Sequence, residues 1–236
     1  MHRQQRPTSV SRPRQSGTRL RDRRYAYPIA LLALFAIIFL ALGIAPLYRE
    51  DWLLENVLVF IALPVLAFGI RRVRFTNLAY TSLFLFFVLH EVGAHYTYSL
   101  VPYDVWFEAL TGRPLNELLG WQRNHYDRLI HFAYGLLIVP VVVELFGQVA
   151  APRGVWRFIL PVTFITSHSV IYELVEWAAA WRFGGDLGTA YLGTQGDEWD
   201  SQKDMALALL GAGLGMLILG ALRPQRGSSA QLRTAR

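Results

Sequence analysis

Six apolar runs of about twenty residues constrain this chain more than any other feature of its sequence. A helix needs roughly 20 apolar residues to cross the hydrocarbon core of a bilayer, which is about 30 Å thick. Only 17% of the 236 residues are charged, whereas a soluble domain carries about 25%. The sequence therefore predicts an all-α polytopic membrane protein, a bundle of six transmembrane helices within residues 26–223. The runs cover residues 27–47, 52–70, 78–96, 128–147, 155–181 and 204–222.

Basic residues gather toward one side of this predicted bundle. Six crossings place both termini on the same side, and that side collects 17 of the 23 lysines and arginines, eight of them within residues 1–24. The positive-inside rule assigns that side to the cytoplasm. We therefore expect disordered basic cytoplasmic tails at residues 1–25 and 224–236, in a protein of the bacterial inner membrane. Topology then accounts for the net charge of +6, so we expect the lipid bilayer and no nucleic acid as partner.

Ionisable residues occur inside or beside four of the runs, although a charged side chain near the bilayer centre costs about 2.5 to 3.5 kcal/mol. Because successive helices cross in opposite directions, these residues all reach the outer leaflet. Pairs such as Asp127 with His131 are four residues apart, so each set occupies one face of its helix. We expect one inward-facing polar pocket there. Its candidate residues are Glu91, His95, His125, Asp127, Arg128, His131, His168, Tyr172, Glu173, Glu176, Asp197, Asp200 and Asp204.

Imidazoles and carboxylates suit a divalent ion such as Zn²⁺ or Mn²⁺, whereas the absence of cysteine excludes thiolate ligands, disulfides and thiol nucleophiles. An acidic group beside such a site orients an imidazole or acts as a general base. The predicted metal ligands are His95, His131, Glu173 and Glu176. The predicted catalytic groups are Asp127, Glu173, Glu176 and Asp204.

Two other interpretations use the same residue types. An ion- or proton-coupled transporter or channel would titrate these carboxylates. In a structural membrane protein, pairs such as Asp127 with His131 would only fix helix packing. The chain has no HExxH, GxSxG, Walker or dinucleotide-binding motif that would name a reaction.

Two further segments predict how the helices are packed and covered. Gly211 and Gly215 form a GxxxG pair in the last run, which favours close packing of that helix within the fold. Residues 99–123 form the longest outer loop and mix Trp106 and Leu110 with acidic side chains. This composition predicts a short amphipathic segment covering the pocket at the membrane surface.

Four polar segments resemble those of the YjdF-type bacterial inner-membrane proteins. They read Gly-Ala-His-Tyr-Thr-Tyr at 93–98, Arg-Asn-His-Tyr-Asp-Arg at 123–128, Tyr-Glu-Leu-Val-Glu-Trp at 172–177 and Leu-Gly-Thr-Gln-Gly-Asp at 192–197. The resemblance covers about residues 48–222, with Ala94 and Lys203 departing from the commoner residues. It implies a multi-pass inner-membrane protein and no particular reaction.

A more distant similarity concerns layout alone. Asp127 followed by His131 in one helix, an acidic fifth helix, and Asp204 leading into a Gly-rich last helix are similar in arrangement to VanZ-like envelope proteins. This similarity implies a role in the cell envelope. We therefore expect a metal-dependent enzyme acting on a lipid-linked or other envelope substrate as the first hypothesis.

Overall fold

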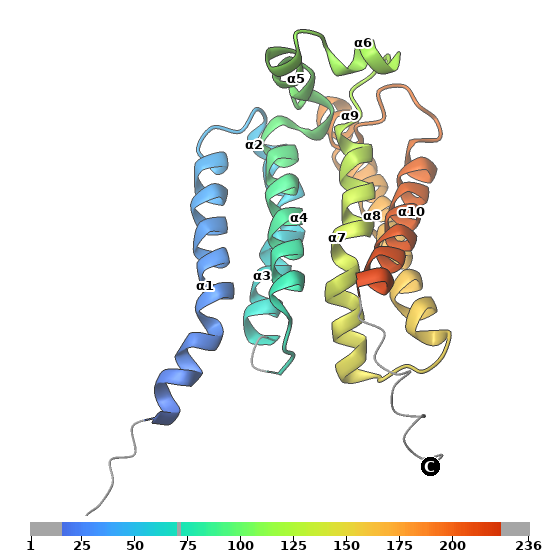
Figure 1. The fold of residues 1–236 in the computed structure, drawn as a ribbon. Coiled ribbons are helices and arrows are strands. Elements are labelled where there is room, and N and C mark those ends of the chain that lie inside the picture. Colours follow the sequence, from blue (N-terminus) through green and yellow to red (C-terminus); the bar gives the residue numbers. More distant parts are fainter. Residues whose placement is uncertain (1–15, 70–71, 223–236) are drawn as a thin grey trace, which may run out of the picture.

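The computed structural model describes residues 16–69 and 72–222, and every regular element in these ranges is a helix (Figure 1). Six helical stretches within them are long and apolar enough to cross a membrane, which confirms the predicted fold class. They are Tyr25–Gly43, Arg49–Gly69, Asn77–Tyr96, Tyr126–Val149, Trp156–Phe183 and Asp200–Leu222. In chain order the helices are α1 (Ser16–Gly43), α2 (Arg49–Glu55), α3 (Val57–Gly69), α4 (Asn77–Tyr96), the 3₁₀ turn η1 (Tyr98–Leu100), α5 (Tyr103–Thr111), α6 (Leu115–Leu119), α7 (Tyr126–Val149), α8 (Trp156–Phe183), α9 (Gly185–Leu192) and α10 (Asp200–Leu222).

The structure describes only a small part of the two predicted tails. Helix α1 begins at Ser16, inside the segment predicted as a tail, where arginines and a leucine favour helix. Residues 1–15 and 223–236, which hold most of the two predicted tails, lie outside the described residues. The disorder of the tails therefore stays a prediction.

The second span consists of two helices, α2 and α3, which meet at Asn56. This residue closes α2, and its Nδ2 donates to the carbonyl of Trp52 at 2.9 Å. Such a side-chain bond competes with the helical backbone pattern and favours a local break. The acidic residues of α2 therefore lie at the N-terminal end of the span.

Helices α7 and α10 pack with their backbones in contact. A Cβ atom added to Gly135 would lie 2.1 Å from the Ala208 carbonyl oxygen, and one added to Gly211 would lie 2.2 Å from that of Phe132. Gly215 approaches Val139 in the same way. The GxxxG prediction is therefore confirmed: small residues allow the last helix to pack against α7 inside the fold. Both helices of this seam carry residues of the polar site.

The connections α5, α6 and α9 all lie at one end of the bundle (Figure 1). Helices α5 and α6 form within the loop that was expected to cover the pocket, and each ends at a glycine, Gly112 and Gly120. Both glycines have positive φ, 82° and 67°, which a residue without Cβ adopts at little cost. That end of the bundle also holds the starts of α7 and α10, which carry Asp127, His131 and Asp204.

Candidate functional site

Three ligand-type side chains converge near the N-terminal ends of α7 and α10. One donor atom each from Asp127, His131 and Asp204 lies within 4.8 Å of the others, a spacing that a single metal ion can bridge. We call these three residues the carboxylate–histidine group. Asp127 and His131 are one turn apart on α7, and Asp204 is on the first turns of α10. The α7–α10 seam therefore fixes the relative position of all three.

Glu173 of α8 adds a fourth polar group. Its Oε1 lies 3.4 Å from Nε2 of His131, and Oδ1 of Asp127 lies 3.7 Å from the same nitrogen. The imidazole is thus enclosed by carboxylates from its own helix and from α8. The side chains of His131 and Glu173 are 8% and 7% exposed, so little bulk water reaches them.

Two oxygens of this group lack partners. Oε1 of Glu173 and Oδ1 of Asp204 are buried and accept no hydrogen bond from any described residue. A buried polar atom without a partner costs about 1–3 kcal/mol, and more when it is charged. A cation or a proton removes this cost. Two carboxylates and an imidazole form a donor set that fits Zn²⁺ or Mn²⁺.

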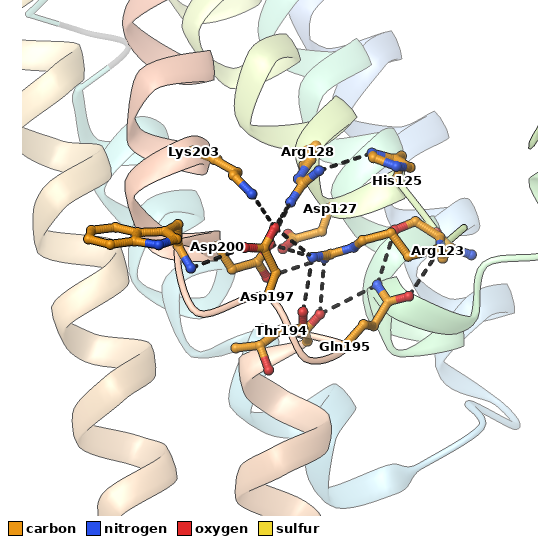
Figure 2. A network of polar contacts seen from close by, with 12 residues as sticks. Arg123, His125, Asp127, Arg128, Thr194, Gln195, Asp197, Asp200 and Lys203 are labelled. Carbon is orange, nitrogen blue, oxygen red and sulfur yellow. Dashed lines mark hydrogen bonds and ion pairs between the residues drawn. The ribbon is translucent and has the colours of Figure 1, made fainter. Parts of the chain in front are cut away.

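A second set of side chains lies next to this group, at the same end of the bundle. Arg123 donates to both carboxylate oxygens of Asp200, at 2.7 Å and 3.2 Å, and Arg128 donates to Asp197 and, at 3.2 Å, to Asp200 (Figure 2). Lys203 lies 2.5 Å from Asp197. We call these five residues the arginine–aspartate network. It ties the loop before α7 to the segment that begins α10.

Main-chain contacts strengthen the same connection. Arg123 also donates to the carbonyl of Thr194 at 2.9 Å, and the side chain of Gln195 bonds both the N–H and the carbonyl of Asn124 at 3.0 Å. A Cβ atom added to Gly193 would lie only 3.9 Å from Oδ2 of Asp127. The loop held by the network is therefore adjacent to the carboxylate–histidine group.

The network perturbs two ionisable groups outside the spans. The hydrogen bond from Lys203 is the main reason that the pKa of Asp197 is lowered to about 2, and the N–H of Trp199 contributes next. Burial, followed by the charges of Arg128 and Arg123, lowers the pKa of His125 below its usual value. The lowered pKa of His125 favours its neutral form at pH 7. Asp197 forms ion pairs with both Arg128 and Lys203, and Lys203 is the residue that departs from the YjdF-type pattern.

A cavity of about 80 Å³ lies beside the carboxylate–histidine group, between α4, α7 and α8. Two tyrosine hydroxyls on its walls have acid–base partners: Tyr98 bonds Nδ1 of His90 at 2.5 Å, and Tyr172 donates to Glu55 at 2.9 Å. The cavity is lined by Phe86, His90, Tyr98, Asp127, Ile130, His131, Tyr134, His168, Ser169 and Tyr172. The predicted residues His168 and Tyr172 therefore line the same cavity as Asp127 and His131.

Helix α2 carries buried acidic residues that were not among the predicted candidates. Asp51 and Glu55 are buried, and so is Glu91 of α4, which lies beside the side chains of Asn56 and Trp52. Both oxygens of Asp51 and both of Glu91 lack hydrogen-bond partners in the described part of the chain. Asp51 and Glu55 have the i,i+4 spacing of the other polar pairs and start a span on the same side, and this signal would have identified them.

The structure thus places the predicted pocket residues at several different locations. Asp127, His131, Glu173 and Asp204 come together, and His125, Arg128, Asp197 and Asp200 belong to the covering network or contact it. Glu176 is buried one turn beyond Glu173 on α8. His95 is not brought to the group: its Nδ1 lies 2.7 Å from the carbonyl of Leu42, against α1. Six residues of the network, of the cavity wall and of α2 were not among the predicted candidates: Asp51, Glu55, His90, Tyr98, Arg123 and Lys203.

The fold and this site define a class: a multi-pass helical membrane protein with a buried carboxylate–histidine group at one end of its bundle. The chain belongs to the family described as predicted membrane protein (DUF2238), whose model matches residues 27–225. It is also 39% identical over 178 residues to the inner membrane protein YjdF of Escherichia coli (strain K12), which covers 75% of this chain and 80% of that protein. No solved structure matches it. The protein is thus a multi-pass protein of the inner membrane, as its resemblance predicted.

Proposed function

We propose that this protein is a metal-dependent enzyme of the inner membrane that acts on a lipid-linked or other envelope substrate. The observation that carries the proposal is the convergence of Asp127, His131 and Asp204 within 4.8 Å, with the unpartnered oxygen of Glu173 beside them. The three residues are the proposed ligands. His95 is not among them, because its ring already bonds the Leu42 carbonyl.

Each residue of the site has a role in this proposal. Asp127, His131 and Asp204 would hold a divalent ion, which would supply Lewis-acid chemistry: it would polarise a substrate oxygen and lower the pKa of a bound water. Glu173, whose Oε1 lies 3.4 Å from Nε2 of His131 and accepts no hydrogen bond within the described ranges, is the group that would accept a proton from a reacting water. Arg123 and Asp200 close the outer side and limit the access of water. Substrate enters from the cavity between α4, α7 and α8, whose walls combine Phe86 and Ile130 with tyrosine hydroxyls and so fit a molecule with an apolar part.

We further propose that the site faces the periplasm and that both termini are cytoplasmic, because arginines concentrate at the opposite end. Alkaline phosphatase, which is active only in the periplasm, reports this orientation. A fusion after Arg236 should be inactive, and an insertion after Gly112, between α5 and α6, should be active. The reverse pattern would refute the orientation.

Proton- or ion-coupled transport is the second candidate, favoured by the partnerless acids Asp51 and Glu91. A transport path also needs ionisable groups on the other half of the bundle. Among the spans that the structure describes, that half offers Glu144, whose carboxylate already accepts from the N–H and the hydroxyl of Thr76 at 2.7 Å and 2.6 Å. This arrangement favours an enzyme with one-sided access over a transporter.

Metal content tests the proposal directly. Protein purified in detergent should hold about one equivalent of zinc or manganese by elemental analysis, and His131→Ala or Asp204→Asn should lower the affinity for added Zn²⁺ roughly 10- to 100-fold or more. The matched control is Glu117→Gln, which removes an exposed carboxylate paired with Arg113 and should leave metal content unchanged. If the wild-type protein takes up neither metal in titration calorimetry, or if both site variants retain it, the proposal is wrong.

A further inference from the structure

A large cleft opens at the end of the bundle opposite the carboxylate–histidine group. Helices α7, α8 and α10 enclose about 560 Å³ there, next to the loop that joins α7 to α8. Figure 1 shows this loop at the far end from α5, α6 and α9. The cleft has the volume of a typical small-molecule site, which is about 300–1,000 Å³.

The walls of this cleft are apolar and its rim is basic. Phe146 of α7, Phe158 of α8 and Met216 of α10 contribute apolar surface, whereas Arg153 and Arg157 stand at the rim. An amphiphile with a negative head and an apolar tail matches this distribution. A small soluble anion would use the rim alone.

The two arginines carry charge that the protein does not neutralise. Neither Arg153 nor Arg157 forms an ion pair with an acidic side chain among the residues that the structure describes. Arg157 donates through Nε to the carbonyl of Pro152 at 3.1 Å, which positions its guanidinium at the loop. Glu144, the acidic residue near the end of α7, is engaged by Thr76.

The start of α8 adds to the positive potential. Its first turn contains no acidic residue, and Val155 at its N-cap supplies no capping side chain, so the positive end of the helix dipole is not balanced locally. The span that ends at Val149 and the span that begins at Trp156 place the arginines at the depth of lipid headgroups. The apolar walls then lie at the depth of acyl chains.

We propose that this cleft, defined by Arg153, Arg157, Phe146, Phe158 and Met216, binds an acidic phospholipid. The arginines bind the phosphate of the headgroup, and the apolar walls hold the first part of an acyl chain. Basic pockets between transmembrane helices recognise lipid headgroups in this way. The site is separate from the carboxylate–histidine group and does not depend on the proposed enzyme activity.

The test compares two lipids and inorganic phosphate on the full-length protein in a neutral detergent. Phosphatidylglycerol should raise the melting temperature and stay bound in native mass spectrometry, whereas phosphatidylcholine with the same acyl chains and inorganic phosphate should do neither. The double variant Arg153→Gln and Arg157→Gln should bind phosphatidylglycerol roughly 30-fold more weakly. Arg74→Gln is the matched control, because it removes an arginine at the same end that does not line the cleft, and it should bind the lipid as the wild type does.

Each alternative outcome identifies a different error. Equal binding of the two lipids shows that the apolar walls act without charge selection and overturns the proposal. A phosphate-induced shift equal to that of phosphatidylglycerol reduces the cleft to a site for soluble anions and also overturns it. If the glutamine variant fails to fold, the variant with Arg153→Lys and Arg157→Lys keeps the charge and should retain selective binding; loss of the preference for the acidic lipid in that folded variant refutes the headgroup assignment.

Discussion

Replacing Gly211 by alanine should weaken both the fold and the metal site, because Gly211 lies where α10 touches α7. The new Cβ would lie 2.2 Å from the Phe132 carbonyl oxygen, and ordinary contacts begin at 3.4 Å, so the two helices would have to separate by roughly 1 Å. Phe132 follows the proposed ligand His131 directly, and Asp204 is two helical turns before Gly211. The separation therefore moves two proposed ligands apart.

The magnitude follows from the cost of overpacking, which is about 1–3 kcal/mol. At roughly 2–4 °C per kcal/mol for a chain of this size, we expect the melting temperature to fall by about 2–12 °C. The assay is thermal unfolding of the detergent-purified protein, combined with a titration of added Zn²⁺, for which the affinity should fall in the same variant.

Gly213→Ala is a stringent control for this prediction. It lies two residues further along the same helix, and a Cβ added there meets no atom within 4 Å. Alanine also favours helix over glycine by about 1 kcal/mol, so this variant should unfold at the same temperature as the wild type or higher. If Gly211→Ala and Gly213→Ala unfold at the same temperature, the close packing of α7 and α10 inferred from the structure is wrong.

Two further predictions concern the arginine–aspartate network. Arg123→Gln removes the two-point partner of Asp200, which then keeps only its contact with Arg128, and should destabilise the protein by about 1–3 kcal/mol in urea unfolding, whereas Arg113→Gln, which breaks an exposed pair, should cost less than about 1 kcal/mol. The network should also respond to acid: because the pKa of Asp197 is lowered to about 2, its contribution to stability is complete above pH 4 and is lost as the pH falls through 2. The difference in melting temperature between wild type and Asp197→Asn should therefore be largest at pH 6 and shrink below pH 4; a difference that grows with acid would contradict this assignment.

The sequence allowed the depth of the polar residues to be predicted because the length of a span fixes the height of each residue in the bilayer. This argument predicted that Asp127, His131, Glu173 and Asp204 meet, and in the structure these four side chains lie together at one end of the bundle. The close α7–α10 contact was predictable for a similar reason, since a GxxxG pair within an apolar span favours the approach of two backbones.

Rotation around the helix axes could not be predicted in the same way. The i,i+4 spacing shows that Glu91 and His95 share a face of α4, but it does not say which neighbour that face meets. In the structure Glu91 lies beside α2 and His95 contacts α1, whereas His90, one position earlier than Glu91, lines the cavity next to α7. Asp51 lies just before the second predicted run, which begins at residue 52, and Glu55 lies in its first turn; neither was among the predicted candidates.

The last span supplies Asp204 to the site and Asp200 to its cover, and this has a consequence for biosynthesis. While the ribosome makes the chain, Arg123 and Arg128 reach the membrane well before Asp197 and Asp200, the acids that pair with them, have been translated. A nascent protein therefore carries two arginines without their counter-charges, and only the final segment supplies these. A product that terminates before residue 197 would keep both arginines unpaired, so the balance of charge at this end of the bundle depends on complete synthesis.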